Sequence, residues 1–197
     1  MSKQEKALDL LFVSKVRIKA LAYFLLNPDR SIHLRGAVRE FKEEINAVRR
    51  ELLRLEEMKL ISVEKQGNRK YFKLNIKHIF IDELMSIFHK SYGIGGEIIQ
   101  KANKIGDLDF AILTSSYTKG IYIGDQIIDL ALIGDVNLTE LESIVKAYEH
   151  KSGREIHYTV LKTSEFQTRK RRRDDFIMNL VLNKSVMLVG QFEDLVR

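Results

Sequence analysis

Asn46, Arg50 and Arg54 recur at four-residue intervals within a leucine-rich stretch. Because a helix turns by about 100° per residue, this spacing places the three side chains near one face of a helix. Asparagine and arginine can each form two hydrogen bonds with the edge of an adenine or a guanine. The chemistry that this face offers is therefore base recognition in a groove of DNA. The opposite face carries an apolar stripe of Ile45, Val48, Leu52 and Leu55.

The element that must carry this face is a helix over residues 44–58, and a second helix is expected before it. Ser31 can cap a helix over residues 32–41, whose apolar residues recur at core spacing while Arg35 and Arg39 face outward. Residues 42–44 then form the turn between the two helices. The order of these elements predicts a helix-turn-helix.

A hairpin is expected next, because the apolar pattern changes from helical to alternating over residues 61–74. Gly67 and Asn68 at its tip are residue types that accept a positive φ in a tight turn. Arg69 and Lys70 follow them directly and would point toward a phosphate backbone. The tip residues Asn68, Arg69 and Lys70 are therefore assigned as a second DNA contact.

The charge of the chain is concentrated in this region. Residues 1–75 carry 17 Lys and Arg against 10 Asp and Glu, whereas the remaining residues carry 16 against 17. A basic segment of this kind favours a polyanionic partner, because each neutralised phosphate releases a counterion. Glu43, Glu44, Glu51 and Glu57 argue in the other direction, since they would repel phosphates if they faced DNA. A protein-docking module with a solvated cationic face remains the alternative.

The segments 45–52, 60–61 and 67–71, with Leu55, resemble the winged helix-turn-helix repressors of the arsenical-resistance (ArsR) type, over residues 12–76. The resemblance implies a transcription regulator that binds double-stranded DNA, and such single-domain proteins usually bind as homodimers. Base edges would be contacted by Asn46, Arg50 and Arg54, and phosphates by Arg35, Arg49, Arg69 and Lys70. Metal-sensing relatives use Cys or His pairs. This chain has no cysteine and its five histidines lack ligand spacing, so we expect neither a metal site nor a cofactor.

The chain is expected to divide into two domains near the break in charge. We assign residues 1–78 to the DNA-binding domain and residues 79–96 to a connecting helix and a hinge, with Gly93, Gly95 and Gly96 in the hinge. The glycine run resembles a phosphate-binding loop only superficially, because no Lys-Ser or Lys-Thr pair follows it. Residues 97–197 would form a small mixed α/β domain. The fold class is therefore α+β, with strands expected at 110–114, 127–133, 156–161 and 186–189 and helices at 138–150 and 164–182.

The second domain contains a pattern that resembles the nucleotidyltransferase superfamily. Ser115 and Ser116 stand near the place of its Gly-Ser turn, Gly120 follows, and Asp129 matches the second acid of its Asp-x-Asp pair. Two carboxylates at that spacing on a strand could share two Mg²⁺ ions. The first acid is replaced by Ile127, which predicts that the metal site is degenerate and that the domain is not an enzyme.

A ligand could still bind at this turn. Ser115, Ser116 and Lys119, with Gly120 and Asp129, could hold a nucleotide or another anion as an effector, because a serine hydroxyl and turn amides bind phosphate without a metal. An ordinary strand-to-helix turn is the alternative. Two further functions are kept open, namely an active nucleotidyltransferase and a protein-interaction or antitoxin-like component.

The remaining features concern the surface and the location of the protein. Residues 169–173 are five consecutive cations followed by two aspartates, which is more typical of a solvated helix face than of a DNA contact. No apolar segment approaches the ~20 residues of a membrane span. We therefore expect no membrane partner and a cytoplasmic location.

Overall fold

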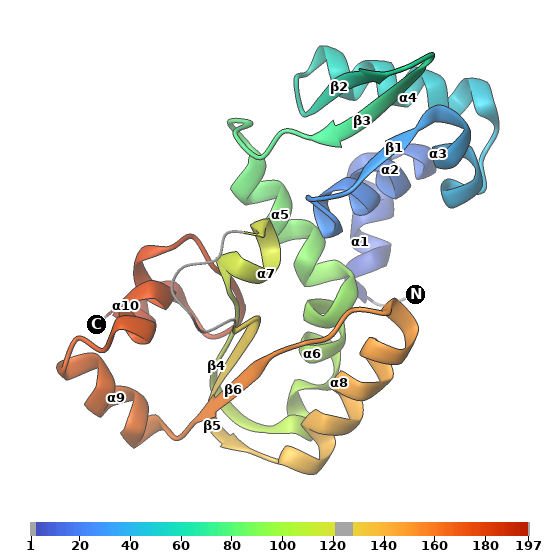
Figure 1. The fold of residues 1–197 in the computed structure, drawn as a ribbon. Coiled ribbons are helices and arrows are strands. Elements are labelled where there is room, and N and C mark those ends of the chain that lie inside the picture. The colour runs from blue at the N-terminus through green and yellow to red at the C-terminus, as the bar shows by residue number, and fades with distance from the viewer. Residues whose placement is uncertain (1–2, 121–127, 197) are drawn as a thin grey trace. The chain divides into compact units, whose positions relative to one another are not determined.

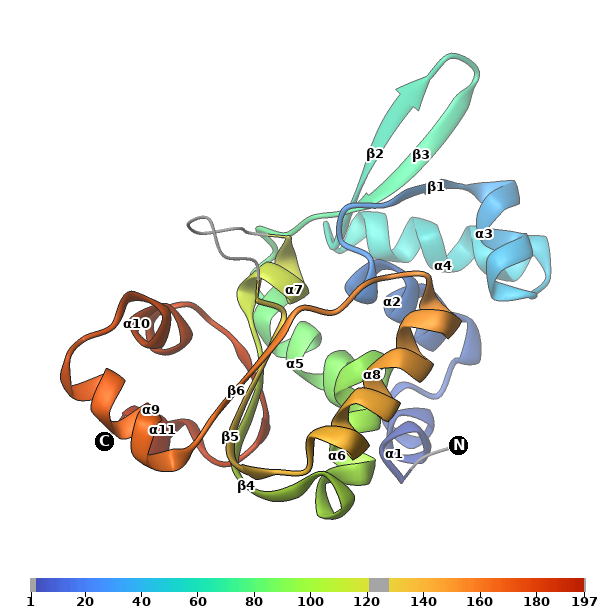
Figure 2. The ribbon, with the colours of Figure 1, turned by 60° about the horizontal axis from the view of Figure 1, so that its bottom comes forward.

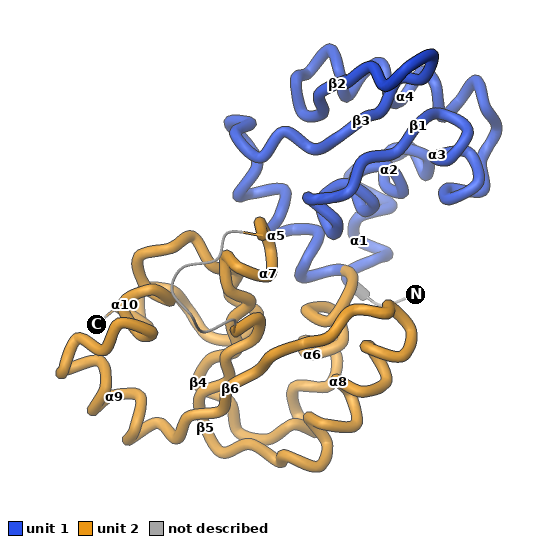
Figure 3. Tube along the Cα trace, viewed as in Figure 1, with its two compact units in different colours: residues 1–91 blue, residues 92–197 orange. Residues whose placement is uncertain are grey.

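The computed structural model describes residues 3–120 and 128–196. The chain forms two compact units, unit 1 at residues 1–91 and unit 2 at residues 92–197 (Figure 3). Helices and strands occur in both units, which confirms a mixed α+β fold.

Unit 1 combines helices with one small antiparallel sheet (Figure 1). The strand order is β1-β3-β2, so the hairpin of β2 and β3 is joined by the short strand β1. The hairpin extends beyond the helices of this unit (Figure 2). The elements are α1 (Lys3–Phe12), α2 (Lys15–Leu26), β1 (Ser31–His33), α3 (Leu34–Phe41), α4 (Ile45–Glu57), β2 (Ile61–Gln66), β3 (Arg69–Leu74) and α5 (Ile81–Ser91).

Helix α4 forms where the apolar stripe predicts it. Val48, Leu52 and Leu55 are buried, and burial of each such side chain stabilises the fold by roughly 1.5–3 kcal/mol. Ile45 is the exception, because it lies in the first turn and remains 37% exposed. The helix is capped at its start by Glu44 and ends within one residue of its expected end. Its opposite face is left exposed.

The start of α3 differs from the expectation. Residues 31–33 form strand β1, in which Ser31 pairs with Lys73 and Ile32 with Phe72, so Ser31 does not cap the helix. His33 is the cap instead, because its Nδ1 accepts a hydrogen bond of 2.7 Å from the backbone N–H of Gly36. The ladder to β3 and the burial of Ile32 outweigh a local serine cap.

Unit 2 contains a four-stranded sheet of order β6-β5-β4-β7. Figure 2 labels β4, β5 and β6 of this sheet. Strands β5 and β6 are parallel and the other neighbours are antiparallel. The elements are α6 (Gly93–Ile105), β4 (Gly106–Leu113), α7 (Ser115–Lys119), β5 (Leu130–Val136), α8 (Leu138–Ser152), β6 (Tyr158–Leu161), α9 (Thr163–Arg171), α10 (Asp175–Leu182), β7 (Val186–Val189) and α11 (Phe192–Val196).

Helices cover both faces of this sheet. Successive side chains of a strand point to opposite faces, so alternate residues of β4 and β5 enter two separate cores. Helices α6 and α8 pack on one face and α9, α10 and α11 pack on the other. The first core contains Ala111, Leu113, Leu130 and Leu132, and the second contains Phe110, Ile112, Ala131 and Ile133.

Several features of this region differ from the expectation. Strand β4 starts at Gly106 rather than at residue 110, and β5 ends at Val136 rather than at residue 133. The glycines at 93, 95 and 96 lie in the first turns of α6 rather than in a hinge, because the buried Ile94 ties these turns to the core of unit 2. The single helix expected over residues 164–182 is two helices. Arg173 adopts a φ of 54°, and the side chain of Asp174 caps α10 by accepting from the N–H of Phe176. Among the described residues, no helix is long and apolar enough to cross a membrane.

Candidate nucleic-acid interface

A groove of about 630 Å³ opens in unit 1 between α3, α4 and the β2–β3 hairpin. Its charged lining residues are all cationic, and they come from three different elements. The structure thus brings together Arg35, Arg49, Asn68, Arg69 and Lys70, five of the residues that the sequence assigns to DNA. Arg39, which the sequence places on the outer side of its helix, joins them. We call these five cations, Arg35, Arg39, Arg49, Arg69 and Lys70, the cationic rim.

The cationic rim has no counterion among the residues that the structure describes. In the part of the chain that the structure describes, none of its five side chains forms an ion pair. Lys19 and Lys101, in contrast, are paired with Glu43 and Glu97. Like charges gathered without counterions repel one another, and an anion in the groove relieves that repulsion. The groove is therefore suited to a polyanion.

The hairpin positions its cations through a two-residue turn. Gly67 has a φ of 59°, whereas Asn68 keeps a negative φ, so only the first of the two expected positions uses the left-handed region. Lys65 then lies directly opposite Lys70, and Gln66 lies opposite Arg69. Like charges facing each other across a ladder are unfavourable. The repulsion between these cations at the tip of the hairpin would also be reduced by a bound anion.

The outward face of α4 holds the residues assigned to base edges. Asn46 and Arg50 are exposed there, next to Arg49 of the cationic rim. Arg54 is also exposed, but its Nη1 lies 3.6 Å from Oε2 of Glu51 on the neighbouring side of the helix. None of these three residues lines the groove, so the structure does not join the residues assigned to base edges to the cationic rim in one pocket.

Two of the acids that argue against DNA binding are neutralised inside unit 1. Glu51 is only 3% exposed, and its Oε1 accepts a hydrogen bond of 2.6 Å from Nε of Arg17 on α2. The same hydrogen bond raises the pKa of Arg17. Glu43 accepts a hydrogen bond of 2.6 Å from Nζ of Lys19. Neither carboxylate is free to repel a phosphate.

Glu44 keeps its charge at the exposed start of α4. Its Oε2 accepts hydrogen bonds from the backbone N–H groups of Asn46 and Ala47, at 2.8 and 3.0 Å. These bonds hold the pKa of Glu44 below its ordinary value. A carboxylate at a helix N-terminus also stabilises the helix dipole. Glu44 is thus a structural cap that stands beside the outward face of α4.

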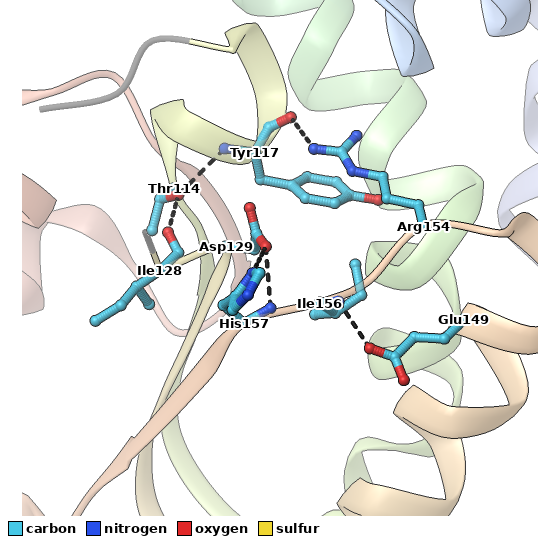
Figure 4. A network of polar contacts seen from close by, with 8 residues as sticks. All are labelled: Thr114, Tyr117, Ile128, Asp129, Glu149, Arg154, Ile156 and His157. Atoms are coloured by element: carbon cyan, nitrogen blue, oxygen red, sulfur yellow. Dashed lines mark hydrogen bonds and ion pairs between the residues drawn. The ribbon is translucent and has the colours of Figure 1, made fainter. Parts of the chain in front are cut away.

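The surroundings of Asp129 in unit 2 form a separate polar network (Figure 4). Asp129 is 4% exposed and stands just before β5. Its Oδ2 accepts a hydrogen bond of 3.0 Å from the backbone N–H of His157 and lies 3.2 Å from Nδ1 of the same residue. Its backbone oxygen accepts from the N–H of Thr114. Asp129 therefore ties the chain before β6 to the end of β4. Ile127, at the first-acid position, lies outside the described residues.

Ser115 and Ser116 are the first two residues of helix α7. Thr114 caps this helix, and its Oγ1 also donates a hydrogen bond of 2.6 Å to the carbonyl of Ile128. Ser115 and Ser116 line a small pocket of about 40 Å³ with residues of α10 and of the segment before β7. Its described lining residues do not include Lys119, Gly120 or Asp129, so the structure divides the residues expected to share a ligand.

Tyr117 and Arg154 hold α7 in place and were missed by sequence reasoning, because no local pattern joins them. The Arg154 guanidinium lies 3.8 Å from the centre of the Tyr117 ring and donates a hydrogen bond of 3.1 Å to the Tyr117 carbonyl (Figure 4). The Tyr117 hydroxyl lies 3.1 Å from that of Tyr148 on α8. Burial raises the pKa of Tyr117, so its hydroxyl stays protonated.

No protein-family model matches this chain, and comparison with curated proteins gives no match. A search of solved structures matches human N-acetylserotonin methyltransferase in complex with SAM, at 15% identity and a TM-score of 0.28. The match covers 62% of this chain and 39% of that chain. The prediction that the protein is not an enzyme is contradicted by this match to a methyltransferase, and it is withdrawn. At this TM-score the match assigns no reaction to the chain.

Proposed function

We propose that the protein is a sequence-specific DNA-binding transcription regulator whose unit 1 is a winged helix-turn-helix. The observation that carries the proposal is the convergence of the cationic rim from α3, α4 and the hairpin on one groove, with no ion pair to any of its members among the described residues. In the proposed complex, α4 enters the major groove of DNA and the hairpin contacts the sugar-phosphate backbone.

In the proposed complex, some residues contact base edges and others contact phosphates. Arg50 and Asn46 on the outward face of α4 contact base edges, because both are exposed there and both have two-point hydrogen-bonding groups. The cationic rim and Asn68 contact phosphates. Arg54 takes a lesser part, because Glu51 holds its guanidinium to one side.

Unit 2 has a proposed role as the sensor of the regulator. Its mixed sheet with helices on both faces, and a short turn from β4 into α7, support a nucleotidyltransferase-like fold. Ser115 and Ser116 line a pocket at that turn and are the proposed contacts of a small anion, because a pocket of about 40 Å³ is too small for a nucleotide. We further propose that the regulator binds DNA as a homodimer.

The test is a selection of bound sites from random duplexes with the full chain, followed by anisotropy titrations of the selected duplex over a range of salt. We expect one enriched motif and a logarithmic salt slope of about −4 to −5 if the five rim cations each neutralise a phosphate. Lys70→Gln should weaken all duplexes alike and reduce the magnitude of that slope by about 1.

The matched control is Lys146→Gln, which removes the same charge from an exposed lysine of unit 2 that is paired with Glu142. It should leave both affinity and slope unchanged. Failure to enrich any motif, or equal effects of the two lysine variants, would overturn the proposal and favour a protein-docking module.

A further inference from the structure

The floor of the groove differs from its rim, because it is apolar. Leu52 of α4 and Phe72 of β3 form its buried part, and Leu53 of α4 stands 50% exposed beside them. Leu34 of α3 completes the floor. A DNA backbone uses cations and amide donors but has no apolar body to cover such a surface. The proposed function therefore accounts for the rim and leaves the floor unexplained.

A histidine stands at the same place. His33 lines the groove, and its Nδ1 is occupied by the hydrogen bond from the N–H of Gly36. In the neutral imidazole the proton is then on Nε2, which makes that nitrogen a hydrogen-bond donor. The His33 ring lies 5.5 Å from the Tyr71 ring, which limits its rotation. The groove thus combines an apolar floor, a fixed donor and the cationic rim.

We propose that this groove binds a small amphipathic anion, namely an aromatic carboxylate or sulfonate, and that the bound anion excludes DNA. The volume of about 630 Å³ lies within the range of small-molecule sites. The aromatic body would cover the exposed surface of Leu53 and Leu34, because Leu52 and Phe72 are already almost fully buried. The anionic group would take the position of a phosphate at the rim. Competition follows because both ligands need the same cations. The regulatory part of this inference rests on the proposed DNA-binding function, whereas the binding part does not.

The binding part is tested without DNA. The probe is 8-anilinonaphthalene-1-sulfonate, whose fluorescence rises in an apolar site, titrated into the full chain. Leu53→Gln should weaken its binding about tenfold, because it removes much of the apolar contact on the floor. The matched control is Leu138→Gln, which changes a leucine of unit 2 with a similar exposure of 53%. Thermal melts followed by circular dichroism check that both variants are folded.

The requirement for an anion is tested with a neutral analogue and a rim variant. N-phenyl-1-naphthylamine has the same aromatic body without the sulfonate, and it should bind at least tenfold more weakly. Arg69→Gln should weaken the sulfonate about fivefold and leave the neutral compound unchanged. Equal binding of the two compounds, or equal binding of the sulfonate to the Leu53→Gln and Leu138→Gln variants, would overturn the inference.

The regulatory part is tested by displacement. Adding the sulfonate to the complex with the selected duplex should release the DNA, and adding duplex should reverse the fluorescence gain. Simultaneous binding of both ligands overturns the exclusion. If the sulfonate binds as described but no duplex binds in any titration, the anion site stands and the proposed DNA-binding function fails, so the two failures are distinguishable.

Discussion

The side-chain amide of Asn46 donates a hydrogen bond of 3.1 Å to the Glu44 carboxylate at the start of α4. The same carboxylate accepts from the backbone N–H of Asn46. The residue best suited to contact an adenine is therefore held by an acid two positions before it. In the proposed complex with DNA, Asn46 must release Glu44 to contact a base, and the carboxylate would then remain close to the phosphates.

Glu44→Gln should strengthen DNA binding by about two- to fivefold, because it removes a negative charge beside the interface while keeping a side-chain acceptor for the helix cap. The measurement is an anisotropy titration with the selected duplex. Glu142→Gln removes an exposed carboxylate from unit 2 and should have no effect. An unchanged affinity in Glu44→Gln would show that this face of α4 does not approach DNA.

The Glu44 cap should also make stability depend on pH. Its pKa is lowered by the hydrogen bonds from Asn46 and Ala47, so it contributes stability at pH values above its ordinary pKa, and this contribution is lost as the pH falls through the lowered value. Urea unfolding at a series of acidic pH values should show a loss in the wild type that is smaller in Glu44→Gln. Parallel pH profiles of the two proteins would contradict this assignment.

Arg50 and Arg54 should respond differently to removal. Arg50→Ala should cost about 1–3 kcal/mol of specific binding and relax the sequence preference at one position. Arg54→Ala should cost less, since the Arg54 guanidinium lies beside the buried Glu51. The comparison requires repeating the site selection with each variant. A larger loss of specificity in Arg54→Ala would reverse the assignment of the two residues.

The Arg17–Glu51 pair should be important for the stability of unit 1. Among the described residues, Arg17→Ala leaves the buried Glu51 carboxylate with Arg54 at 3.6 Å as its one remaining cation, so we expect a loss of about 2–4 kcal/mol in urea unfolding. Replacing both Arg17 and Glu51 with Met should recover part of that loss, because no buried charge then lacks a partner. A double variant less stable than Arg17→Ala would show that Arg17 and Glu51 stabilise unit 1 by their packing as well as by their charges.

Asp129 should act as a structural residue of unit 2. Asp129→Ala removes the acceptor of the His157 N–H and should cost about 1–3 kcal/mol in urea unfolding. Asp129→Asn keeps an acceptor oxygen and should cost less. Asp135→Ala, on the exposed end of β5, serves as the control. Equal losses for Asp129→Ala and Asp135→Ala would remove the structural role.

Local patterns predicted the elements that local forces determine. The stripe at Val48, Leu52 and Leu55 identified α4, and the alternation around Gly67 identified the hairpin, because periodicity and turn chemistry act within a few residues. The pairing of Ser31 with Lys73 was missed, since it joins residues about forty positions apart.

In the candidate site, too, local features were predicted from the sequence and long-range contacts were not. The exposed cations of α4 and the hairpin were identified from their spacing, because an exposed face needs no partner. The pairing of Glu51 with Arg17, thirty-four residues away, depends on how α2 packs against α4. The contact of Arg54 with Glu51 is local, since the two residues are three positions apart on α4, but the spacing alone did not single it out. The apolar floor of the groove was not foreseen either. Its residues are assigned to the core by their type, and only tertiary packing leaves Leu53 half exposed.

The pairing of β7 with β4 delays completion of the sheet of unit 2 while the chain is synthesised on the ribosome. Strand β4 is complete at Leu113, but its second neighbour is made only when Val186–Val189 emerge. Until then, one edge of an apolar strand stays uncovered, and uncovered strand edges promote aggregation. Unit 1, whose sheet closes by Leu74, meets no such delay. We therefore expect unit 2 to be the part of the nascent chain that depends on chaperones.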